Sequence, residues 1–130
     1  MTAALTVAQL DARLASEPLR TTSRRVPGGE LSLVIGTSSE GQSLVLSSGY
    51  FGVEPALERV SALVSTRGVR SVRRVEGVSD AVSAYVDGDL AALDSVEVLQ
   101  AGGAFMQDAW IALRTVPAGT TTSYTALAAL

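Results

Sequence analysis

The sequence predicts an α+β protein, in which a small domain of sheet and helix comes first and a segment built only of helices follows. Two runs rich in β-branched and leucine side chains flank a turn-forming loop between residues 31 and 46, which indicates a hairpin. Apolar residues recur at helical spacing over 105–116, which indicates a helix. The chain has 130 residues, of which 47% are apolar, enough for one domain and part of another. We place the boundary between two units at 1–92 and 93–130.

The first half of the chain is expected to hold one helix and one hairpin. The spacing of the leucines predicts a helix over Val7–Ser16, which Pro18 ends. Thr21–Gly29 is basic and rich in turn formers, so we interpret it as a turn-rich connection. The hairpin strands are then Leu31–Ile35 and Leu44–Leu46.

Two further helices are expected before residue 92. Pro55–Val64 has an apolar face and a proline suited to a first turn, and Val78–Val86 repeats the helical pattern. Between them, Arg67–Arg74 carries four arginines that alternate loosely with valines. We interpret this cluster as a solvated loop or an exposed strand face, and contact with phosphate is the alternative.

The last third of the chain is expected to be helical after a short extended piece at Val96–Leu99. The helix Phe105–Val116 has one apolar face, so Phe105 and Trp110 are expected in the core. Pro117 cannot continue this helix. A second helix, Tyr124–Leu130, then begins after several N-cap candidates.

Three residue types that often carry chemistry are missing from the chain. Without Cys there is no disulfide, no thiolate metal ligand and no thiol nucleophile. Without His and Lys, the commonest general base and the Schiff-base amine are also missing. All ten cations are therefore arginines, and the net charge of −3 argues against strong nonspecific binding of nucleic acid.

The sequence carries no signal for a membrane or for export. No apolar run approaches the roughly 18 residues that span a bilayer. The N-terminal segment has no basic region before an apolar core, so it does not read as a secretory signal. We therefore expect a cytoplasmic protein with no membrane partner.

A longer sequence pattern spans the two helices predicted in the last third of the chain. In the segment FMQDAWIALRTVPAGTTTSYTALAAL, a helix with a tryptophan leads through a proline turn into T-x-S-Y at the start of the next helix. This segment, Phe105–Leu130, is similar to the start of the DNA-binding domain of the methylated-DNA–protein-cysteine methyltransferases, the O6-alkylguanine repair family. Ala84–Leu90 also resembles the A-Y-F-x-G-x-L stretch that closes that family's N-terminal domain. The matching positions in the longer segment are Phe105, Ala109, Trp110, Leu113, Val116, Pro117, Gly119, Thr121, Ser123, Tyr124, Leu127 and Ala128.

The resemblance implies a sheet-plus-helix domain followed by the start of a helix-turn-helix, winged-helix-like domain. Family members flip an alkylated guanine out of double-stranded DNA and move the alkyl group to their own cysteine, without a cofactor. The family's P-C-H-R motif would lie beyond Leu130, so we expect a chain truncated before its active site. Such a chain would be inactive as a methyltransferase and would bind DNA weakly or not at all.

The resemblance implies a DNA-binding role for two residues. Tyr124 matches the family tyrosine beside the flipped nucleotide and its phosphate, and Ser123 matches the serine at the same helix start. The plainer alternatives are a simple N-cap for Ser123 and a half-buried helix residue for Tyr124. No catalytic residue and no metal ligand is assigned. Two other functions remain open, a non-catalytic DNA-binding relative and a structural or interaction domain formed by residues 1 to about 90.

Overall fold

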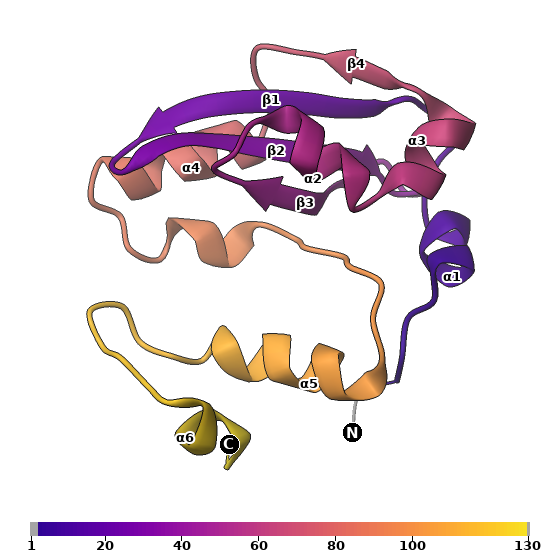
Figure 1. Ribbon diagram of the computed structural model, residues 1–130. Coiled ribbons are helices and arrows are strands. Elements are labelled where there is room, and N and C mark those ends of the chain that lie inside the picture. Colours follow the sequence, from indigo (N-terminus) through magenta and orange to yellow (C-terminus); the bar gives the residue numbers. More distant parts are fainter. Residues whose placement is uncertain (1–2, 130) are drawn as a thin grey trace.

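A computed structural model describes residues 3–129 and shows an α+β fold built on one mixed four-stranded sheet (Figure 1). Three antiparallel strands follow one another as β1 (Leu19–Val26), β2 (Gly29–Thr37) and β3 (Ser43–Gly49). A short fourth strand, β4 (Val69–Ser71), runs parallel to the first three residues of β1. The strand order across the sheet is therefore β3-β2-β1-β4, and the predicted α+β class is confirmed.

Helices cover both faces of this sheet. In Figure 1, α2 and α3 lie against one face and α4 against the other, while α5 and α6 lie apart from the sheet beyond the 3-10 turn η1. The helical elements are α1 (Val7–Ala12), α2 (Val53–Glu58), α3 (Ser61–Arg67), α4 (Val78–Val86), η1 (Ala92–Ser95), α5 (Ala104–Leu113) and α6 (Tyr124–Ala128).

The side-chain alternation of the strands divides the core into two layers. On one face, Leu19, Val34 and Leu46 pack with residues of α1, α2 and α3. On the other face, Leu33 and Ile35 pack with valines from α4 and the loop before it. Because β2 is covered on both sides, it is buried from Ser32 to Gly36 without interruption.

The first helix is shorter than predicted. It begins with a capping box, in which the Thr6 hydroxyl accepts the N–H of Gln9 at 3.1 Å and the Gln9 side chain accepts the N–H of Thr6 at 2.9 Å. The helix then ends at Ala12, so the predicted range Val7–Ser16 is correct only in its first part. Beyond it, Leu14 forms an isolated bridge with Ser38 instead of continuing the helix.

The turn-rich connection predicted over Thr21–Gly29 is wrong, since most of it forms β1, an interior strand of the sheet. Thr21 and Thr22 are buried, and two of the strand's hydroxyl groups make hydrogen bonds. The Thr22 hydroxyl donates to the Arg73 carbonyl at 3.0 Å, and the hydroxyls of Ser23 and Ser32 lie 3.0 Å apart on paired strands. Tertiary pairing therefore overrode a composition that favours turns.

The hairpin and the helix at Val78–Val86 are confirmed, the latter with the predicted bounds. The helix predicted over Pro55–Val64 is two helices, α2 and α3, because Val60 adopts φ −124° and ψ 31° between them. Pro55 does lie in the first turn of α2. The apolar spacing runs unbroken through the interruption, so periodicity alone could not reveal it.

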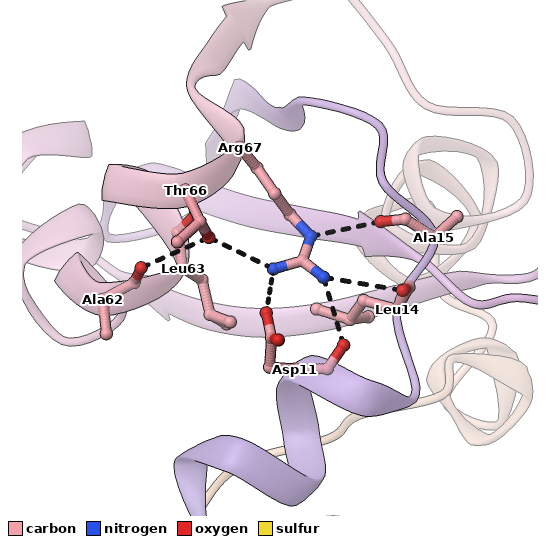
Figure 2. A network of polar contacts seen from close by, with 7 residues as sticks. All are labelled: Asp11, Leu14, Ala15, Ala62, Leu63, Thr66 and Arg67. Atoms are coloured by element: carbon pink, nitrogen blue, oxygen red, sulfur yellow. Dashed lines mark hydrogen bonds and ion pairs between the residues drawn. The ribbon is translucent and has the colours of Figure 1, made fainter.

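One member of the arginine cluster is a structural residue. The Arg67 guanidinium forms an ion pair with the Asp11 carboxylate and donates to the carbonyl of Ala15 at 3.1 Å (Figure 2). It also donates to the Asp11 and Leu14 carbonyls at 3.1 and 3.5 Å, and its side chain is only 9% exposed. Arg67 therefore fastens the end of α1 to the end of α3. The other three arginines match the predicted solvated loop or exposed strand face, since Arg70 is exposed in β4 and Arg73 and Arg74 are exposed in the loop after it.

Candidate functional site

The two residues predicted to contact DNA lie at the start of α6. The Ser123 backbone is extended at φ −106° and ψ 164°, and its hydroxyl accepts the N–H of Ala126 at 3.1 Å. Its carbonyl accepts the N–H of Leu127 at 2.9 Å, which begins the helix. Ser123 is thus an N-cap, and its side chain remains exposed to solvent.

Tyr124, the next residue, is 93% exposed. Within residues 3–129 its hydroxyl makes no hydrogen bond, so both the ring and the hydroxyl are free to meet a ligand. The half-buried alternative for Tyr124 is therefore wrong.

A tight turn sets where this helix start lies relative to α5. The backbone N–H and the hydroxyl of Thr120 both donate to the Pro117 carbonyl, at 3.2 and 2.6 Å. Gly119 has φ +78°, a left-handed conformation that disfavours any residue with a side chain. The P-x-G spacing found in the sequence is therefore a real turn, and it directs the chain from the end of α5 toward Ser123.

The helix that precedes the turn buries none of its residues. Phe105 is 76% exposed, so its predicted place in the core is wrong. Trp110 is half-buried, and its ring lies against Gly102, where an added Cβ would come within 2.9 Å of the indole. Helical spacing predicted that these residues share one face, but spacing carries no information on what covers that face.

A mostly apolar groove of about 710 Å³ lies between the second face of the sheet, α4, η1 and the end of α5. Leu31, Val82 and Leu93 are among the side chains that line it, and Arg114 donates to the Leu93 carbonyl at 3.4 Å on its rim. Most of its lining is aliphatic, and Ser48, Tyr50, Tyr85 and Asp94 add polar groups. It can receive an apolar side chain.

Two kinds of site are absent from the part of the chain that the structure describes. Residues 3–129 contain no group of three or more acidic, His or Cys side chains placed to hold a metal ion. In the same range no helix is both long and apolar enough to cross a bilayer.

Comparison with known proteins gives a partial similarity. No family model matches the sequence, and no solved structure matches it. The chain is similar to the methylated-DNA–protein-cysteine methyltransferases of Salmonella typhimurium (strain LT2) and Salmonella typhi, at 40% identity over 53 residues in each case. The match covers 41% of this chain and 31% of each relative, so this chain spans about a third of the length of the relatives it matches.

Proposed function

We propose that the chain is a relative of the suicidal DNA-repair methyltransferases, which move the alkyl group of O6-alkylguanine in DNA to their own cysteine. The observation that carries this proposal is the 40% identity over 53 residues to proteins named for that reaction. The ordered match of Ala84–Leu90 and Phe105–Ala128 to the family's pattern supports it. The division into an N-terminal unit, 1–92, and the start of a DNA-binding unit, 93–130, belongs to the same proposal.

These 130 residues alone are proposed to be inactive in the transfer. The acceptor in this chemistry is a thiolate, and the chain contains no cysteine. Serine and tyrosine hydroxyls are much weaker nucleophiles without an adjacent base, and the chain has no histidine to act as one. A transfer would therefore need a cysteine supplied from outside these residues.

Ser123 and Tyr124 are the residues that we propose to contact double-stranded DNA. The exposed ring of Tyr124 is available to lie against a displaced nucleotide, and the capped helix start at Ser123 presents N–H groups that suit a phosphate. The contact is weak in this chain, because a groove-reading helix does not follow within the described residues.

The test uses duplex DNA with a single O6-methylguanine that carries a labelled methyl group. The expected result is no label on this chain, while the Salmonella typhimurium relative, run in parallel, takes up label. Transfer of even one methyl group per chain would overturn the inactivity. A gel shift at low salt with the same duplex completes the test, and no preference for the lesion is expected.

A structural or interaction domain is the second candidate, favoured by one observation. Every buried side chain in the described part of the chain lies between Leu5 and Val82. If the N-terminal unit is the functional part, a chain that ends after Gly103 should keep the thermal midpoint of the full chain. A large loss of stability in that shortened chain would count against this candidate.

A further inference from the structure

A second pocket lies on the opposite side of the sheet from α2 and α3, between β1 and the first turns of α4. Its volume is about 410 Å³. Arg24, Arg73 and Arg74 line it together with Asp80, and Leu33 contributes apolar surface. The charged lining is thus three arginines against one aspartate, a net of +2 in a chain whose net charge is −3.

Two of these arginines have no counter-charge. Arg74 forms an ion pair with Asp80, which leaves neither of those groups free. Arg24 and Arg73 are exposed, and among residues 3–129 no carboxylate is paired with either of them. Two guanidinium groups without a counter-charge, on residues that line one pocket, favour an anion that both can share.

The main chain of β1 adds a donor to the same pocket. The Leu19 N–H donates to Gly68 and the Thr21 carbonyl accepts from Val72, so the odd-numbered residues of β1 turn their backbone groups toward β4. Because β4 pairs only with the first three residues of β1, this edge is open at Ser23. The alternation places the Ser23 N–H on that open edge.

The side chain of Ser23 supports this assignment. Its hydroxyl lies 3.0 Å from the hydroxyl of Ser32. Ser32 is buried on the other face of the sheet from the pocket, the face that α2 and α3 cover. Ser23 nevertheless lines the pocket, so the part of the residue that does so is its backbone. Backbone N–H groups and arginine guanidinium groups both bind anionic oxygens in proteins.

The wider charge distribution agrees with an anionic ligand. Six of the ten arginines lie in only two short stretches, 20–25 and 70–74, which are neighbours along β1, β4 and the loop that follows. The acidic residues Asp87, Asp89, Asp94 and Glu97 lie together in the chain after α4 and around η1. An approaching anion is therefore drawn to the β1–β4 side of the molecule.

We propose that this pocket binds a phosphate group, with the guanidinium groups of Arg24 and Arg73 and the Ser23 N–H as its donors. The pocket volume exceeds that of one phosphate, so Leu33 would lie beside the part of the ligand that carries it. None of these residues belongs to the α5–α6 segment, so this site does not depend on the proposed relationship to DNA-repair methyltransferases.

The test is a titration with inorganic phosphate at fixed ionic strength, followed by the backbone amide resonances of the full chain. Saturable shifts are expected at Ser23, Arg24 and Arg73. Arg73→Gln removes one of the two guanidinium groups and should weaken phosphate binding about tenfold. Arg13→Gln is the matched control, since Arg13 is an exposed arginine outside the pocket, and it should leave the affinity within about twofold.

A short unmodified DNA duplex then distinguishes the two sources of such a phosphate. If the duplex shifts the same three amides and phosphate competes with it, the ligand is a nucleic-acid backbone. If the duplex leaves them unchanged while phosphate shifts them, the ligand is a small phosphorylated molecule. The proposal is overturned if phosphate causes no saturable shift at these amides, or if Arg73→Gln and Arg13→Gln bind it equally well. Tyr124→Ala should have no effect on phosphate binding, which separates this site from the α6 contact.

Discussion

Leu5 and Gly102 lie side by side and exchange two backbone hydrogen bonds, from the Leu5 N–H to the Gly102 carbonyl at 2.9 Å and from the Gly102 N–H to the Leu5 carbonyl at 2.8 Å. This bridge joins the first described residues to Gly102, which lies two residues before α5. Because α5 itself buries no side chain, it is held by contacts of this kind, which include the bridge, the packing of Trp110 on Gly102 and the hydrogen bond from Arg114 to the Leu93 carbonyl.

Gly102→Ala should loosen this attachment. The new Cβ would lie 2.9 Å from Trp110 Cη2 and 3.2 Å from Cζ3, so the indole must move, at a cost of about 1–3 kcal/mol. Trp110 is the only tryptophan, so a red shift of the fluorescence reports its displacement directly. Gly103→Ala is the control, since its Cβ would meet nothing within 4 Å and its φ of −67° suits alanine. Equal spectra for the two variants would contradict the prediction.

Arg67→Ala should destabilise the fold by about 2–3 kcal/mol, because it leaves the Ala15 carbonyl without its donor and the Asp11 carboxylate without its ion-pair partner. Arg74→Ala removes the other ion pair of the described chain, in which both side chains are about 60% exposed, and should cost less than about 1 kcal/mol. Urea unfolding of both variants measures the difference. If Arg67→Ala costs no more than Arg74→Ala, the network in Figure 2 does not hold α1 to α3.

The segment from Gln100 onward is expected to be the least stable part of the molecule. Neither α5 nor α6 has a buried residue, and α6 is five residues long, which is too short to persist without packing. Hydrogen exchange should be fast across both helices and slow in β1 and β2. Slow exchange throughout 104–129 in a dilute monomer would show that another surface covers these helices.

Ser123→Ala should unwind α6 locally, since the cap to the Ala126 N–H is worth about 1 kcal/mol. Ser123→Asp keeps an acceptor at the same position and should preserve the helix. Tyr124→Ala should leave stability within about 0.5 kcal/mol, because the side chain is 93% exposed. Cα chemical shifts over 124–128 measure all three variants. Loss of α6 in the tyrosine variant would mean that the ring packs on the protein.

Local sequence signals predicted the elements whose stabilising contacts are themselves local. The apolar spacing of the helix Val78–Val86 and the N-cap at Ser123 can both be read from residues within four positions of one another, and both elements are confirmed. The hairpin is confirmed for the same reason, since its strands are consecutive. β1 also pairs with a consecutive strand, β2, but it was missed because its threonine, serine and arginine side chains lack the apolar pattern of an ordinary strand.

The candidate site likewise has features that the local sequence predicts and features that it does not. The turn at Gly119 and the helix start at Ser123 follow from the sequence, because proline, glycine and serine each restrict the chain locally. The exposure of Phe105 does not follow, because it depends on which surface α5 meets. The sequence suggested contact with phosphate only as the alternative for the Arg67–Arg74 cluster. The proposed pocket could not be predicted, because it needs the fold to bring Arg24 and Arg73 together from two different elements.

The contact between the 96–99 stretch and β3 bears on how the protein behaves at high concentration. β3 is an edge strand with the apolar run Leu44–Leu46, the kind of surface on which identical chains can stack into fibrils. The Val45 N–H donates to Glu97 and its carbonyl accepts from Leu99, so the middle of that edge is already occupied. At the other edge, β4 is three residues long with Arg70 at its centre, and its charge and brevity discourage stacking. Removing the 96–99 stretch should therefore increase aggregation of the chain, as light scattering at rising protein concentration would measure.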